Sequence, residues 1–114
     1  MDSLGLYLKD EQINSAVEIM KKLGILHLAG RDVMQLSGGQ RQMVMFASVL
    51  IKKPKILLLD EPVSALDMHH QCVLLDCVRK FTREHGITTV MILHDLSLAS
   101  QFSDEVLLLS DGKI

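Results

Sequence analysis

The residues Leu36-Ser37-Gly38-Gly39-Gln40 have the types and the order of a phosphate-binding turn at the start of a helix. Glycines lack a Cβ and let the backbone come close to a ligand. The unpaired N–H groups and the positive end of the helix dipole then favour a phosphate oxygen. An ordinary N-cap formed by Ser37 explains the same residues, and Ser-Gly-Gly taken alone favours that simpler interpretation.

A second group of polar residues follows the apolar run Ile56-Leu57-Leu58-Leu59. A buried strand would deliver the carboxylate of Asp60 to the edge of a sheet, where it can hold Mg²⁺ directly or through water. The adjacent Glu61 points elsewhere and can act as a general base toward an attacking water. The alternative is an acidic loop at the N-terminus of the next helix.

These polar residues need helices and strands that bring them together, and the hydrophobic pattern predicts such elements. Helices are expected where apolar residues recur every three or four positions between a capping residue and a glycine or proline. Strands are expected where apolar residues run continuously, which is typical of a strand buried on both faces. The expected helices cover residues 10–24, 37–53, 67–86 and a short segment from 95, and the expected strands cover 56–60, 87–93 and 105–109, followed by a hairpin turn at 110–112.

The alternation of strands and helices predicts an α/β fold with a mainly parallel sheet covered by helices. The crossovers between parallel strands are expected to be right-handed. Ligands bind at the carboxyl ends of the strands in such sheets. Asp60, Glu61 and His94 fall at the ends of predicted strands, so we expect one shared site at this edge.

The overall composition restricts the classes of protein to which the chain can belong. The 114 residues suit at most one compact domain, and 48% hydrophobic with 23% charged residues exclude global disorder. A formal net charge of −2 offers no field for non-specific capture of nucleic acid. The longest apolar run, residues 43–51, is far short of a membrane span, and two cysteines are too few for a disulfide framework. We therefore expect a soluble cytosolic chain.

Four short motifs in one order together resemble those of the ATP-binding cassette (ABC) ATPases. Residues 36–40 look like the signature motif of that family, and residues 56–61 resemble its Walker B strand with the catalytic glutamate. Ser64-Ala65-Leu66-Asp67 resembles the D-loop, and His94 resembles the switch histidine. The motifs follow one another with family-like spacing across residues 36–95, so the chain is identified by resemblance as a member of this family.

The resemblance implies ATP and Mg²⁺ as ligands and a head-to-tail dimer of nucleotide-binding subunits. Asp60 would hold Mg²⁺, Glu61 would activate water, and His94 would touch the γ-phosphate in the same subunit. Asp67 would reach across the dimer interface. The γ-phosphate on the opposite subunit would be contacted by the signature residues Ser37, Gly38, Gly39 and Gln40.

The phosphate loop of the family, G-x-x-x-x-G-K-[ST], is missing, and the only Gly-Lys pair, Gly112-Lys113, lies in the predicted hairpin. The resemblance therefore implies the C-terminal half of a P-loop NTPase-like domain. Residues 1–36 would be the end of the helical subdomain, and residues 37–114 would carry the signature helix, Walker B, D-loop and switch histidine. Without the loop and its lysine, we expect the chain alone to be inactive as an ATPase. We also expect oligomerisation or strand exchange to cover the apolar strands of half a sheet.

The resemblance also implies a transporter subunit that docks on separate permease subunits at the inner face of the cell membrane. It implies no insertion into the membrane and no nucleic-acid partner. Residues 66–71, 94–99, 104, 106–109 and 111–114 are similar to those of importers of iron–siderophore and cobalamin chelates. Two alternatives stay open: a non-catalytic interaction fragment that supplies the signature loop in trans, and a lobe of a DNA-repair ATPase. The second needs a long coiled coil, and residues 1–35 carry no sustained heptad.

Overall fold

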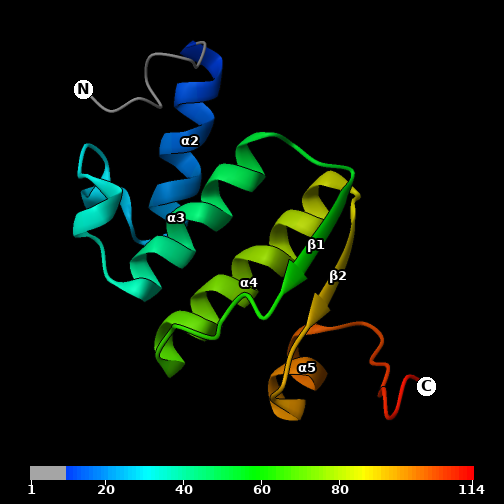
Figure 1. Ribbon diagram of the computed structural model, residues 1–114. Helices are drawn as coiled ribbons and strands as arrows, with labels where there is room; N and C mark the ends of the chain where they lie inside the picture. The colour runs from blue at the N-terminus through cyan, green and yellow to red at the C-terminus, as the bar shows by residue number, and fades with distance from the viewer. Residues whose placement is uncertain (1–9) are drawn as a thin grey trace.

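The structure, a computed structural model, describes residues 10–114, which form helices packed against a two-stranded sheet (Figure 1). Among these residues, no helix combines the length and the apolar character that crossing a bilayer requires. In chain order, with η marking a 3-10 helix, the elements are α2 (Asp10–Leu23), η1 (Leu26–Leu28), η2 (Val33–Gln35), α3 (Gly38–Ile51), β1 (Ile56–Asp60), α4 (Met68–His85), β2 (Thr88–Ile92) and α5 (Leu96–Phe102).

The helix ends lie where local capping chemistry predicts them. Ser37 Oγ accepts the N–H of Gln40 at 3.1 Å, while the Ser37 N–H donates to Gln40 Oε1 at 3.0 Å. Asp67 caps α4, and Gly86 ends this helix with a φ of 60°, a left-handed conformation that suits glycine. Asp95 caps α5 through its side chain, as Asp67 caps α4. The helices predicted from residues 37, 67 and 95 are confirmed.

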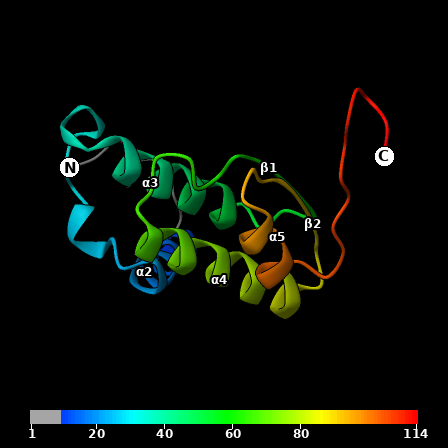
Figure 2. The same ribbon diagram turned by 90° about the horizontal axis from the view of Figure 1, so that it is seen from below.

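The two strands confirm the predicted parallel pairing. The register runs from Ile56 opposite Thr88 to Asp60 opposite Ile92, and α4 is the crossover between the strands. Both strands therefore end at the same edge of the sheet, where the predicted site residues follow them. Figure 2 shows α4 and α5 together on one side of the strands.

One apolar core joins the helices to a single face of the sheet. Its buried residues come from α2, η1, α3, β1, α4, α5 and the segments that connect them. Because burial of one leucine-sized side chain stabilises a fold by about 1.5–3 kcal/mol, this core fixes α3 and α4 relative to β1. The side chains that are most completely buried are Leu23, Met43, Leu50, Leu57, Leu74, Leu75 and Val78.

The prediction that the strands are buried on both faces is wrong for the described residues. In β1, Leu57 is 1% exposed, but its neighbours Ile56 and Leu58 are 65% and 73% exposed. In β2, Val90 and Ile92 are 54% and 53% exposed. The reason is that side chains alternate between the faces of a strand, and residues 10–114 place helices against one face only. We call the uncovered surface of Ile56, Leu58, Val90 and Ile92 the open sheet face.

The prediction of a third strand at residues 105–109 is wrong. This segment does not pair with any described residue. The segment runs away from β1 and β2 (Figure 1), and its three leucines are between 69% and 72% exposed. A strand needs a hydrogen-bonded partner, which apolar composition alone does not supply. The hairpin turn that follows is confirmed, because Ser110 and Lys113 form an antiparallel bridge.

We predict that the open sheet face makes the 114-residue chain self-associate. Each apolar side chain that leaves water on association contributes free energy, about 1.5–3 kcal/mol for complete burial. In sedimentation velocity, the chain should run as a dimer or a larger species whose share rises with concentration. Replacing Leu58 and Val90 together by serine should shift the population toward monomer.

Met34→Ser is the matched control for this experiment, because Met34 is 77% exposed on η2 and lies outside the sheet. This variant should leave the sedimentation profile unchanged. A parent chain that stays monomeric at the highest concentration reached, or an equal effect of Met34→Ser, would contradict the prediction.

Candidate functional site

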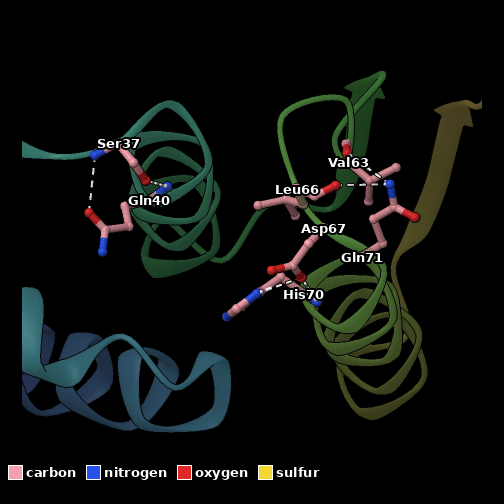
Figure 3. A network of polar contacts seen from close by, with 7 residues as sticks. All are labelled: Ser37, Gln40, Val63, Leu66, Asp67, His70 and Gln71. Carbon is pink, nitrogen blue, oxygen red and sulfur yellow. Dashed lines mark hydrogen bonds and ion pairs between the residues drawn. The ribbon is translucent and has the colours of Figure 1, made fainter.

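The start of α3 presents backbone donors at the positive end of a helix. Ser37 and Gln40 bond to one another in a capping box, which holds the shape of the turn (Figure 3). Among residues 10–114, no hydrogen bond uses the N–H of Gly38 or Gly39. Two such N–H groups at the N-terminus of a 14-residue helix can bind a phosphate oxygen.

Gly39 is required by the packing of the chain itself. A Cβ on Gly39 would lie 2.8 Å from the Ala65 carbonyl oxygen and 3.2 Å from Leu66 Cδ2. A Cβ on Gly38 would meet only Ala65 Cβ, at 3.9 Å. The sequence pattern offers the close approach of a ligand as one reason for both glycines. The structure gives Gly39 a further reason, which is the contact between α3 and the loop of residues 61–67.

Glu61 and His94 lie in contact at the carboxyl edge of the sheet, as the strand ends predict. Glu61 directly follows β1 and has a φ of 50°. The Glu61 N–H donates to the Ile92 carbonyl at 3.0 Å, and His94 Nε2 forms a hydrogen bond with Glu61 Oε1. This hydrogen bond joins residues that follow two different strands, and it fixes the direction of the Glu61 carboxylate.

Asp60 is exposed at the end of β1 and offers a carboxylate to a cation. Among residues 10–114, no three His, Cys, Asp or Glu side chains are grouped so that they could hold a metal ion. Mg²⁺ in nucleotide sites takes one or two protein carboxylates, while water and substrate phosphates complete its coordination. A single exposed carboxylate fits this form of coordination, and does not fit a metal centre built from protein ligands alone.

Sequence reasoning missed two glutamines that hold the 61–67 loop. Gln42, from α3, donates from Nε2 to the Glu61 carbonyl at 3.1 Å and accepts the Ala65 N–H at 3.1 Å. Gln71, from α4, donates from Nε2 to the Leu66 carbonyl at 3.0 Å (Figure 3). Gln42 and Ala65 lie 23 positions apart in the sequence, so no local pattern signals the contact.

The Asp67 carboxylate is occupied by its own helix. Its Oδ1 accepts the His70 N–H at 2.8 Å and the His70 Nδ1–H at 2.7 Å (Figure 3). The backbone hydrogen bond from His70, followed by the bond from its ring, lowers the pKa of the Asp67 carboxyl below its ordinary value. The role across a dimer interface stays a prediction for Asp67, while within the chain it caps α4.

A groove of about 450 Å³ lies beside the starts of α3 and α4. It is lined by the signature residues 37–40, by residues 65–67 with His70, and by residues of the 24–28 segment. Glu61 and His94 do not line it. The structure thus divides the predicted site residues into two groups, one at the groove and one at the sheet edge.

We predict that Gly39→Ala destabilises the chain whereas Gly38→Ala does not. Both changes place alanine in the first turn of α3, and alanine is the better helix former by about 1 kcal/mol. Only the Cβ at position 39 meets backbone, 2.8 Å from the Ala65 carbonyl oxygen. Such overpacking costs about 1–3 kcal/mol. Urea unfolding measures the free energy of unfolding of the parent and of both variants, and equal values for the two variants would disprove the packing role of Gly39.

The lowered pKa of Asp67 predicts a share of stability that is lost in acid. Because this pKa is lower in the folded chain than in the unfolded chain, the ionised carboxylate stabilises the fold above the unfolded pKa, and protonation removes that contribution as the pH falls. Asp67→Asn keeps a capping residue but does not titrate. Between about pH 5 and pH 3, the melting temperature of the parent should therefore fall more steeply than that of Asp67→Asn.

Asp76→Asn provides the control background for this measurement. The pKa of Asp76 is also lowered, by Lys80 and then by Arg79, so Asp76 titrates in the same acid range. Asp76 does not line the groove, so the effect of Asp76→Asn on the melting temperature should add to that of Asp67→Asn. The difference between Asp67→Asn and its parent should persist in Asp76→Asn. If the melting temperatures of the parent and of Asp67→Asn fall equally steeply as the pH is lowered, the assignment is refuted.

The α/β fold is that of the solved ABC ATPase cassettes. The dimeric structure of a bacterial ABC transporter cassette gives a TM-score of 0.81 at 33% sequence identity, with 92% of this chain and 46% of that chain covered. A dimeric post-hydrolysis cassette bound to ADP and Pi gives a TM-score of 0.79 at 32% identity, with the same shares covered.

Residues 6–64 match the sequence model of the family described as ABC transporter, and the chain belongs to this family. It is 40% identical over 114 residues to the aliphatic sulfonates import ATP-binding protein SsuB of Escherichia coli strain K12, covering 100% of this chain and 45% of the relative. It is 41% identical over 106 residues to the ferric enterobactin transport ATP-binding protein FepC of the same strain, covering 93% of this chain and 39% of the relative. The chain thus spans less than half the length of these relatives.

Proposed function

We propose that the chain is part of an ATP-binding and ATP-hydrolysing subunit of an ABC importer. The observation that carries the proposal is the contact between Glu61 and His94 at the carboxyl edge of β1 and β2. Hydrolysis of a phosphoanhydride uses a positioned base beside the attacking water, and a carboxylate held by a second polar group suits that task. Membership of the family through residues 6–64 supports the same reaction.

In the proposed reaction, Glu61 accepts a proton from the water whose oxygen attacks the γ-phosphorus of ATP, the bond from the γ-phosphorus to the bridging oxygen breaks, and ADP and inorganic phosphate are the products. The His94 ring orients the Glu61 carboxylate and contacts the γ-phosphate bound to the same subunit. Asp60 would hold Mg²⁺ directly or through a water molecule. When bound, Mg²⁺ neutralises negative charge on the phosphate oxygens.

The signature residues act in this proposal on ATP held by a second nucleotide-binding subunit in a head-to-tail dimer. Ser37, Gly38, Gly39 and Gln40 line the groove, apart from Glu61 and His94, and this separation supports an action in trans. Asp67 lines the same groove, which supports its proposed role at the dimer interface. The dimeric cassette among the similar structures supports the assembly.

The proposal assigns residues 1–36 to the end of a helical subdomain and residues 37–114 to the signature helix and the catalytic half of the core. Residues 1–9 lie outside the described residues. The 114 residues contain no Gly-Lys-Ser or Gly-Lys-Thr, so a phosphate loop has to come from another segment or another chain. The 114-residue chain is inactive by itself in this proposal.

The proposed solute is an iron chelate, imported through permease subunits on which this subunit docks at the cytoplasmic face of the cell membrane. Two relatives are named for ferric enterobactin transport and hemin import, at 41% and 42% identity. A third is named for aliphatic sulfonates, at 40% identity. Deletion of the intact gene should abolish uptake of a labelled iron chelate. Retained chelate uptake with loss of sulfonate uptake would replace this solute by the other.

We predict that the natural gene product containing this chain hydrolyses ATP with Mg²⁺, and that Glu61→Gln lowers kcat by about 10²–10⁴-fold. Glutamine keeps the size of the side chain but does not accept the proton of the attacking water. Glu84→Gln is the matched control, because Glu84 lies on α4 and its contact with Lys22 is an exposed one of 3.8 Å. Phosphate release as a function of ATP concentration measures the effect. Equal kcat values for the parent and Glu61→Gln would overturn the assignment.

The same assay on the 114-residue chain alone separates the remaining alternatives. Steady hydrolysis that Glu61→Gln abolishes would overturn the requirement for a phosphate loop from elsewhere. ATP binding that appears only on mixing with a phosphate-loop protein would favour a non-catalytic chain that supplies the signature turn in trans. Sequencing the DNA immediately upstream of the Met1 codon then identifies whether the same gene encodes the loop.

A further inference from the structure

Glu61 has a backbone conformation that residues other than glycine rarely adopt. Its φ of 50° lies in the left-handed region, and it directly follows the last residue of β1. Such a conformation costs free energy and persists where the surrounding contacts fix it. The contacts that fix the backbone of Glu61 therefore also determine where its carboxylate points.

Three hydrogen bonds, two from residues 92–94 and one from α3, hold Glu61. Its N–H donates to the carbonyl of Ile92, the last residue of β2, at 3.0 Å. Its carboxylate forms the hydrogen bond with His94. Its carbonyl accepts a hydrogen bond from Gln42 Nε2, from α3, at 3.1 Å. Gln42 thereby ties Glu61 to the helix that begins at the signature turn.

Gln42 uses both ends of its amide on the same loop. Its Oε1 accepts the Ala65 N–H at 3.1 Å, and its Nε2 lies 3.4 Å from Ser64 Oγ. A primary amide combines a donor and an acceptor in one short planar group, which a carboxylate or an ammonium group does not. The side chain is half-buried, so these hydrogen bonds are partly shielded from water. The loop from Glu61 to Ala65 is fixed to α3 at both of its ends.

We propose that Gln42 is a positioning residue for ATP hydrolysis, and that its amide fixes the Glu61 carbonyl and so the direction of the Glu61 carboxylate. The inference rests on the proposed function of Glu61 as the base. Gln42 acts through Glu61, without a role in holding the nucleotide. Gln42 lies three positions after Gly39, whose backbone packs against Ala65, so the start of α3 contacts the loop both by packing and by hydrogen bonds.

Steady-state ATPase kinetics of the natural gene product test this role. Gln42→Met has a similar length and loses all three side-chain hydrogen bonds of Gln42. Gln42→Glu keeps an acceptor for Ala65 and loses the donor to Glu61. Both variants should lower kcat by about 10- to 100-fold, the usual consequence of a misplaced catalytic group. The KM for ATP should stay within about twofold, because ground-state binding is not altered.

Gln71→Met is the matched control for the loss of loop contacts. Gln71 reaches the same loop from α4 and bonds to the Leu66 carbonyl at 3.0 Å, so its removal also loosens the loop. Among residues 10–114, the hydrogen bonds of Gln71 go to the Val63 and Leu66 carbonyls and not to Glu61. Gln71→Met should lower the melting temperature to a similar degree as Gln42→Met. Its kcat should stay within about threefold of the parent value, since the hydrogen bonds that hold the Glu61 backbone are kept.

A spectroscopic measurement on the 114-residue chain reports on position without requiring turnover. The ring ¹⁵N signal of His94 Nε2 depends on its hydrogen bond with Glu61. This signal should shift in Gln42→Met and stay in place in Gln71→Met. The pair of variants therefore distinguishes displacement of Glu61 from general loosening of the loop.

The two measurements separate failure of this inference from failure of the proposed function. If the natural gene product shows no ATP hydrolysis that depends on Glu61, the proposed function is wrong and the role in hydrolysis falls with it. If hydrolysis depends on Glu61 and Gln42→Met keeps the parent kcat, the inference alone is overturned. It is also overturned if the His94 signal does not move in Gln42→Met, or moves equally in Gln71→Met. A shifted signal together with a lowered kcat and an unchanged KM supports it.

Discussion

The contact between the start of α3 and the loop of residues 61–67 is the constraint on which the candidate site depends. The Ala65 carbonyl oxygen occupies the space that a Cβ at Gly39 would need, and the Gln42 amide bonds to both Glu61 and Ala65. A side chain at position 39 would push the helix and the loop apart. The donors of the signature turn and the carboxylate of Glu61 therefore keep one fixed relation, although they belong to different elements.

The two groups of polar residues have different electrostatic character, and neither is complete alone. The start of α3 offers neutral N–H donors at the positive end of a helix. The sheet edge offers the carboxylates of Asp60 and Glu61, which repel a phosphate unless a cation lies between them. The N–H donors of α3 can therefore add to the binding of a nucleotide that other groups hold. The carboxylates at the sheet edge can bind a nucleotide only together with Mg²⁺. This difference supports the proposed head-to-tail pairing, in which each subunit supplies one group to each nucleotide.

The sequence predicted those features of the fold that depend on near neighbours. The caps at Ser37 and Asp67 join residues three positions apart, so local residue types are enough to place the starts of α3 and α4. The strand at residues 105–109 was wrong because pairing depends on a partner that composition does not reveal. The role of Gln42 was missed for the same reason, since its partners Glu61 and Ala65 lie 19 and 23 positions away. The pattern did bring Glu61 and His94 to one edge, because parallel strands end together.

The open sheet face shows where residue types and observed burial disagree. Residues 56–59 are all apolar, as in a strand covered on both faces, yet Leu58 is 73% exposed while Leu57 is 1% exposed. A strand selected for a one-sided sheet would carry polar residues at the exposed positions. The relatives that this chain matches are longer, with 39% to 45% of their length covered, and have additional polypeptide that can cover such a face. The 114-residue chain would use the open sheet face to self-associate, and further polypeptide would pack against the same face. The two contacts therefore compete, and a covered sheet face should not self-associate.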